Sequence, residues 1–200
     1  MTPHRLMAAF AAALALGTAQ AGSVSLRGEL DVDNPNAVML FNFWLSDTAD
    51  VDIQTYSFGG GTDAGLHPID AGGFDPYVSV FTGWGPGAVF LASNDDGLCP
   101  PGQVFGSCAD STLHLAALPA GHYTLALSQP ANFSFAENLG TGTLGDGFIG
   151  LAAGWSGGAC NSVCTSAYAV DITSPSLVPE PAAPLMLALG LLTLALRRRG

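Results

Sequence analysis

The sequence contains no lysine and very little positive charge of any kind. Between residues 22 and 178 the only basic residue is Arg27, whereas fifteen of the sixteen acidic residues lie there, so that this stretch has a net charge of −14. A nucleic-acid-binding protein needs a basic surface that displaces counterions from the phosphates. The charge balance therefore excludes that class, and we expect no nucleic acid among the partners.

Charged residues of both signs are also scarce, at 10% of the chain against about 25% in a typical globular protein. Glycine and proline are plentiful instead, with 26 and 13 copies. Both residues are unfavourable inside helices, which argues against a helical bundle. A chain of 200 residues provides one ordinary domain, and slightly less once terminal targeting segments are set aside.

The first 21 residues have the three zones of a secretory signal peptide. A basic start ends at Arg5, an apolar run covers Leu6–Leu16, and Ala19 and Ala21 supply the small side chains that signal peptidase accepts. We expect cleavage between Ala21 and Gly22, with signal peptidase as a partner during export. A buried N-terminal helix is the alternative, but a basic flank without a cap does not favour it.

The C-terminal end pairs a short apolar stretch with positive charge. Residues 182–196 are followed by Arg197, Arg198 and Arg199. As a helix this stretch is about 22 Å long at ~1.5 Å per residue, shorter than the ~30 Å hydrocarbon core of a bilayer. The arginines favour a cytoplasmic end, which leaves residues 22–178 outside the inner membrane. The segment therefore predicts a removable sorting helix, with a permanent anchor as the alternative.

The order Val178-Pro179-Glu180-Pro181, hydrophobic segment, arginine cluster resembles the PEP-CTERM sorting signal of Gram-negative bacteria. In that family an exosortase cleaves at the Pro-Glu-Pro motif and releases the protein to the surface or the extracellular matrix. The resemblance implies that residues 176–200 are the sorting signal and that an exosortase is the second processing partner. It also implies an inner-membrane intermediate, then a location at the cell surface or in the matrix.

Residues 22–175 alternate apolar and polar side chains in short runs separated by Gly, Pro, Asn and Asp, which is the pattern of β-strands and turns. We expect an all-β fold, a single β-sandwich or jelly-roll domain of about eight or nine strands. The signal helix and the sorting helix would flank it, with no helix inside and with loops at 59–73 and 140–158. The expected strands are 23–30, 37–45, 51–58, 77–81, 88–92, 112–118, 123–128, 149–153 and 168–172.

Several of these strands carry a second resemblance. Residues 50–58, Gly73-Phe-Asp-Pro-Tyr-Val-Ser-Val-Phe81, Phe90-Leu-Ala-Ser-Asn-Asp-Asp-Gly97 and residues 118–127 are similar to a pre-peptidase C-terminal-type β-sandwich, as found in a group of PEP-CTERM proteins with Phe-Asp-Pro and Asn-Asp-Asp elements. Such domains are non-catalytic modules that assist export, stabilise a protein or bind partners. The resemblance implies that this chain is not an enzyme.

All four cysteines, Cys99, Cys108, Cys160 and Cys164, lie in the part of the chain expected to be exported. Oxidising compartments favour disulfides, and four cysteines allow three pairings, of which 99–108 with 160–164 closes the smallest loops. A zinc site is the alternative, although only Cys160 and Cys164 have the close spacing of a zinc ligand pair.

Acidic residues provide the most plausible binding site. Asp75 precedes one expected strand, and Asp95 and Asp96 follow the next, so that a hairpin would bring all three to one end of a sheet. Carboxylates without a basic neighbour suit Ca²⁺, which takes six to eight oxygen ligands. We therefore expect a calcium site, whereas the alternative is that these residues only cap turns. Further candidate ligands are Asp63, Asp70, Asn94 and Asp110.

The sequence indicates the cellular location of the protein more directly than its function. We expect an exported, non-enzymatic surface or matrix protein with a structural or adhesive role and with extracellular polysaccharide as a candidate partner. A carbohydrate-binding module is the alternative, because Trp84 and Trp155 in glycine-rich loops are able to stack on sugars or else to anchor the loops. A secreted hydrolase is less favoured, because no histidine follows Gly154-Trp-Ser-Gly-Gly158 as a triad would need. His114 and His122 are a weaker candidate pair for a metal.

Overall fold

The computed structural model describes residues 22–97, 100, 109–152 and 165–178, and the structural statements below concern these residues. Their secondary structure is mostly β, with antiparallel sheets, which agrees with the all-β prediction. The elements are β1 (Gly22–Glu29), β2 (Val38–Leu45), β3 (Ala49–Tyr56), β4 (Gly61–Thr62), β5 (Pro68–Ile69), β6 (Tyr77–Thr82), β7 (Val89–Asn94), β8 (Thr112–Leu118), β9 (Gly121–Ser128), helix α1 (Phe135–Leu139), the 3-10 turn η1 (Leu144–Asp146) and β10 (Ala167–Ser174).

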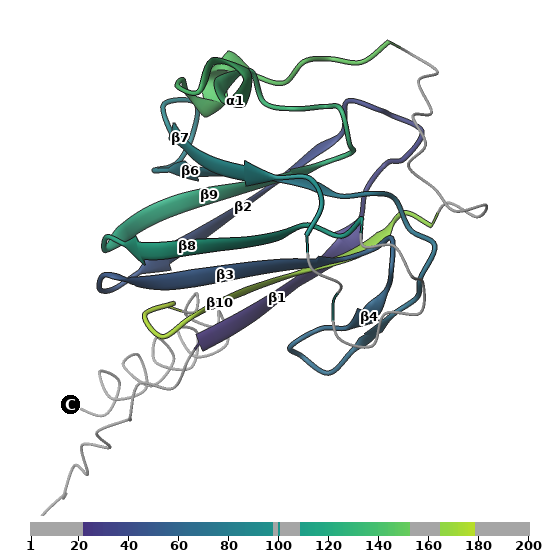
Figure 1. Ribbon diagram of the computed structural model, residues 1–200, viewed down its shortest axis with the longest axis horizontal. Helices are drawn as coiled ribbons and strands as arrows, with labels where there is room; N and C mark the ends of the chain where they lie inside the picture. The colour runs from purple at the N-terminus through teal and green to yellow at the C-terminus, as the bar shows by residue number, and fades with distance from the viewer. Residues whose placement is uncertain (1–21, 98–99, 101–108, 153–164, 179–200) are drawn as a thin grey trace, which may run out of the picture.

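The strands build two four-stranded antiparallel sheets and one small hairpin. The first sheet has the order β1-β10-β3-β8, the second β2-β9-β6-β7, and β4 pairs with β5. Figure 1 shows the two larger sheets one above the other. Their facing sides share one hydrophobic cluster, with Val51 and Ile53 from β3 and Val78 and Val80 from β6 fully buried. Burial of this apolar surface is the main force that holds the two sheets together.

Period-2 alternation explains why these segments become strands. Along β3, Val51 and Ile53 are buried while Asp50 and Asp52 are exposed, because successive side chains point to opposite faces. β9 departs from this pattern, since six consecutive residues from Tyr123 to Ser128 are buried. One face of β9 contributes to the shared core, and the other face is covered by the segment that carries α1.

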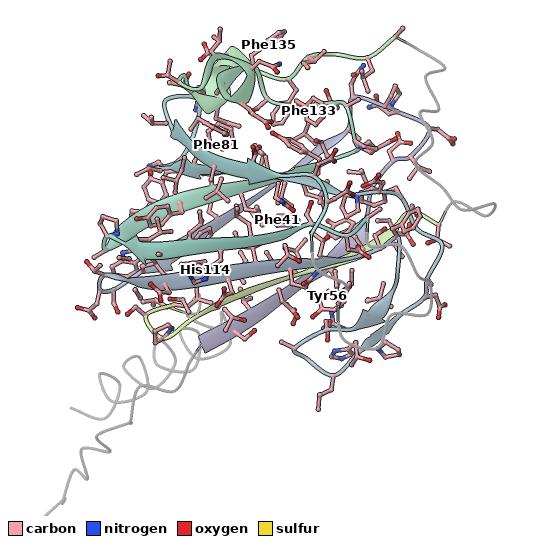
Figure 2. The ribbon with its side chains drawn as sticks, in the orientation of Figure 1. Phe41, Tyr56, Phe81, His114, Phe133 and Phe135 are labelled. Carbon is pink, nitrogen blue, oxygen red and sulfur yellow. The ribbon has the colours of Figure 1, made fainter. Side chains whose placement is uncertain are left out.

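The one-turn helix α1 was not predicted. It lies over the second sheet, where Ala136 joins Phe81 of β6 and Ala126 of β9 in a second buried cluster. Figure 2 shows Phe81 on the side of the sheet that faces α1. The Ser134 hydroxyl caps the helix by accepting a hydrogen bond from the Glu137 N–H at 3.2 Å. This Ser-x-x-Glu spacing is a sequence pattern that indicates the start of a helix.

Two other predictions differ from the structure. Residues 149–152 of the weak strand predicted at 149–153 are not in a strand. The loop predicted at 59–73 contains the two-residue strands β4 and β5. Strands of two residues are too short to show an alternation of apolar and polar side chains. The Asp63 side chain holds their hairpin instead: its carboxylate accepts a hydrogen bond from the His67 N–H at 2.8 Å and lies 3.2 Å from Arg27 of β1.

Both ends of the described body lie side by side. β1 and β10 pair along their full length, from Gly22 opposite Ser174 to Glu29 opposite Ala167. Beyond β10 the chain turns onto the open edge of β2, where the Val178 N–H donates to the Trp44 carbonyl oxygen at 3.0 Å and Leu177 is buried. A Cβ at Gly22 would lie only 3.1 Å from the Leu177 carbonyl oxygen. The folded body therefore extends to Val178.

Candidate functional site

The three aspartates predicted to bind calcium meet at one end of the β6–β7 hairpin. We call Asp75, Asp95 and Asp96 the acidic cluster. β6 and β7 are antiparallel, with Val78 opposite Asn94, so that the residues just before β6 and just after β7 are neighbours. The buried Ser111 hydroxyl lies within hydrogen-bond distance of the Pro76 and Asp95 carbonyl oxygens, at 2.6 and 2.7 Å, and fixes the two arms of the hairpin here.

Electrostatics in this cluster are unfavourable to the charged forms. Burial raises the pKa of Asp75 to about 7, and the negative charges of Asp95, Asp96 and Asp110 add to the rise. Burial, followed by repulsion from Asp96 and Glu137, also raises the pKa of Asp95. One carboxylate oxygen of Asp75 and one of Asp95 are buried without a hydrogen-bond partner. A bound proton or cation would therefore stabilise the acidic cluster, because it would neutralise negative charge that has no partner.

Within the described ranges, no group of three or more His, Cys, Asp or Glu side chains is arranged to hold a metal ion. Calcium binding therefore stays a prediction, and it would require the three side chains of the acidic cluster to close on the ion. Of the further candidate ligands, Asp63 is engaged by Arg27 and His67 at the distant β4–β5 hairpin. Asp70 is exposed near β5, so that neither residue belongs to this cluster.

Asp110 has a structural role beside the cluster. Its carboxylate accepts hydrogen bonds from the Ser57 and Gly59 N–H groups, both at 2.7 Å, and thereby holds the chain where it leaves β3. Burial raises the pKa of Asp110 to about 6, although these hydrogen bonds act in the opposite direction. Asn94 is also occupied, because its side-chain oxygen accepts from the Thr112 N–H at 3.0 Å. Both residues stabilise the loops around the acidic cluster.

The two candidate metal histidines lie apart, which makes their pairing wrong. His114 is on β8 of the first sheet (Figure 2), opposite Asp52, and its Nδ1 lies 2.7 Å from the Asp52 carboxylate. His122 is on β9 of the second sheet. The turn between β8 and β9 crosses from one sheet to the other, whereas the prediction assumed one continuous hairpin. Strand neighbours in sequence are not always neighbours in a sheet.

His122 instead belongs to a row of aromatic rings that the sequence did not reveal. Its imidazole stacks on Trp44 of β2, with ring centroids 5.7 Å apart, and on Trp84, at 4.0 Å. We call Trp44, His122 and Trp84 the aromatic stack. Trp44 is 46% exposed and Trp84 61%. Trp84 was predicted either to bind sugars or to anchor its loop in the core; its exposure contradicts the second interpretation.

A surface hollow of about 540 Å³ adjoins the aromatic stack. Its walls come from the β6–β7 turn and from the turn between β8 and β9, and none of its lining residues is an acid, a lysine or an arginine. This volume lies within the range of small-molecule sites in proteins, about 300–1,000 Å³. Its main lining side chains are Thr82, Trp84, Leu91, Leu118, Pro119 and His122.

Several predicted features lie outside the described residues: the four cysteines Cys99, Cys108, Cys160 and Cys164, Trp155, the segment Gly154–Gly158, Ala21, and the tail residues Pro179, Glu180, Pro181, Arg197, Arg198 and Arg199. The disulfides, the signal peptide and the sorting signal therefore stay predictions. Among the described residues, no helix has both the length and the apolar character needed to cross a membrane.

Comparison with known proteins gives no relative from which a function is transferable: no protein-family model matches the chain, and no curated protein matches it.

Proposed function

We propose that this chain is an exported, non-enzymatic protein of the cell surface or extracellular matrix, processed at both ends, with a structural or adhesive role. The observation that supports the proposal is that all the described strands lie between the two expected cleavage points. β1 begins at Gly22, directly after the expected signal-peptidase bond. Among the residues that the structure describes, the last backbone hydrogen bond to β2 is made by Val178, which precedes Pro179-Glu180-Pro181 in the sequence.

Cleavage at these two points would leave every described strand intact. Proline has no N–H to donate, so that Pro179 and Pro181 are unable to extend the pairing of Val178 along the edge of β2. Signal peptidase and an exosortase would act during export, the inner membrane would hold the tail only transiently, and the mature protein would reach the surface of a Gram-negative cell.

We further propose that the body is a jelly-roll β-sandwich. When the two-residue strands β4 and β5 are left out, eight strands remain. The first of these pairs with the last, β2 with β9, β3 with β8, and β6 with β7. Nested pairs of this kind, divided between two facing sheets, define the jelly roll. The fold is shared by many binding and coat proteins, and by itself it assigns no ligand.

The intact mass of the protein recovered from the cell surface tests the proposal. We expect a chain that begins at Gly22 and ends between Val178 and Pro181. Replacement of the motif by Pro179→Ala, Glu180→Ala and Pro181→Ala should keep the tail on the protein and hold it in the inner membrane. The matched control is Pro175→Ala, which changes a proline inside the folded body. Surface protein that still carries Arg197–Arg199 would contradict the proposal.

A carbohydrate-binding module is the second candidate. The exposed indole of Trp84 favours it, and the next subsection develops this candidate.

A further inference from the structure

The residues of the aromatic stack are held in position by strand pairing and by hydrogen bonds. Trp44 and His122 are directly opposite one another in the β2–β9 register, so that two rigid strands position their rings. Trp84 lies in the β6–β7 turn, whose base is fixed to β9: the Gly83 N–H donates to the His122 carbonyl oxygen at 2.7 Å, and the Thr124 hydroxyl donates to the Gly83 carbonyl oxygen at 2.8 Å. Hydrogen bonds to the Gly83 backbone therefore fix the chain directly before Trp84.

His122 contacts both indoles. Its ring plane is 20° from that of Trp44 and 31° from that of Trp84. The exposed fractions of 46% and 61% leave a large part of each indole to solvent. Apolar surface left in water is costly, at about 25 cal/mol per Å². Two adjacent exposed indoles on rigid supports are therefore typical of a binding surface.

Charge decides which ligand class fits. None of the residues that line the hollow beside the stack is an acid, a lysine or an arginine, so that no ionic group is present to select a charged ligand. The net charge of −14 over residues 22–178 repels anionic polymers at longer range. A ligand with flat apolar C–H faces and uncharged hydroxyl groups matches both conditions.

We propose that the aromatic stack and the adjoining hollow form a binding site for a neutral polysaccharide. A sugar ring would pack its C–H face on the open face of Trp84 or Trp44, as apolar groups pack on aromatic rings. Its hydroxyl groups would exchange hydrogen bonds with the exposed Thr82 hydroxyl and the His122 imidazole, both at the hollow. The inference rests on the proposed function in that a surface or matrix location supplies such a polymer.

Affinity electrophoresis of the purified full chain, in gels that contain hydroxyethylcellulose, galactomannan, dextran or alginate, tests the site. We expect retardation by at least one of the three neutral polymers and none by alginate, which is anionic. Trp84→Ala and Trp44→Ala should each weaken the retarding affinity at least tenfold. His122→Ala should weaken it less, because it removes one hydrogen-bond partner of the sugar and keeps both indoles. Trp84 is mostly exposed, so that its variant should melt within about 1 °C of the wild type.

Phe135→Ala is the matched control. This side chain of α1 is 42% exposed and does not line the hollow, so its removal should leave retardation unchanged. The site is refuted if no neutral polymer retards the wild type, or if the double variant Trp44→Ala/Trp84→Ala is retarded as strongly as Phe135→Ala. Self-association that depends on Trp44 and Trp84, without any effect of polymer, would assign the surface to a second copy of the chain. Because this experiment requires no processing, it fails or succeeds independently of the intact-mass test.

Discussion

Asp75 illustrates how a single residue couples burial to charge. Asp75 comes directly after the buried Phe74 in the sequence. Burial raises the pKa of its carboxyl group to about 7, and the negative charges of Asp95, Asp96 and Asp110 add to the rise. In the unfolded chain the same group titrates near 3.8. Between these two values the folded state binds more protons than the unfolded state. The contribution of Asp75 to the free energy of unfolding is therefore present at low pH and is lost as the pH rises toward 7.

Asp75→Asn should remove this dependence. The amide stays neutral, so that the variant should be more stable than the wild type at pH 8 and almost equal to it near pH 4. The carboxyl group is only partly buried, and solvent screening reduces the gain to about 1 kcal/mol, which corresponds to about 2–4 °C in melting temperature for a domain of this size. Thermal unfolding of both proteins across this pH range measures the difference.

Asp70→Asn is the control for the Asp75 prediction, because Asp70 is exposed outside the acidic cluster. A gain at pH 8 that appears equally in both variants would mean that net charge alone is responsible.

At the scale of elements, the edge of β2 depends on residues that follow the last strand. The Ser46 N–H donates to the Ser176 carbonyl oxygen at 3.0 Å, and Leu177 packs into the shared core with 8% exposed. β2 itself is apolar and carries no charge, and uncovered edges of this kind favour aggregation. Residues 176–178 therefore protect one end of this edge.

A chain that ends at Pro175 should be less stable than one that ends at Val178. The loss of the Leu177 side chain removes a buried leucine, whose truncation costs about 2–5 kcal/mol, and the melting temperature should fall by about 4–20 °C. Leu177→Ala in the longer chain should reproduce most of the decrease, whereas Ser176→Ala, which keeps its backbone hydrogen bond, should not. Equal melting temperatures for the two chain lengths would contradict this role.

Elements also show what local patterns miss. Alternation along β3 is readable because its two faces differ, with buried Val51 and Ile53 between exposed aspartates. Helix α1 has a single turn, too short for a helical period, and only the Ser134–Glu137 cap announces it. The β4–β5 hairpin depends on a contact between Asp63 and the distant Arg27. Short elements are set by tertiary contacts that no window of sequence contains.

At the scale of the whole molecule, fifteen carboxylates face one arginine between residues 22 and 178. Such an imbalance destabilises the compact state through repulsion. Any cation relieves this repulsion by screening, but only a specific site would prefer Ca²⁺ to Mg²⁺, because Mg²⁺ dehydrates reluctantly.

We expect Ca²⁺ at millimolar concentration to stabilise the protein through Asp75, Asp95 and Asp96. At ~100 times the dissociation constant, one site adds about 2.7 kcal/mol, or about 5–10 °C in melting temperature. The measurement compares Ca²⁺ with Mg²⁺ at equal ionic strength, and chelation should reverse the shift. Asp95→Ala/Asp96→Ala should lose it, and Asp31→Ala/Asp33→Ala, two acids outside the cluster, should keep it. Equal shifts in melting temperature from Ca²⁺ and Mg²⁺ would contradict a calcium site and would mean that these three aspartates only cap turns.

The sequence by itself determined the all-β class, most strand positions and the meeting of Asp75 with Asp95 and Asp96, because alternation and hairpin ends are local properties of the chain. Only the tertiary structure decided that β8 and β9 belong to different sheets, which separates His114 from His122. It alone brought His122 beside both Trp44 and Trp84. These neighbours come from three segments far apart in the chain, and their register is set by long-range pairing and by burial of the shared core, which no local pattern encodes.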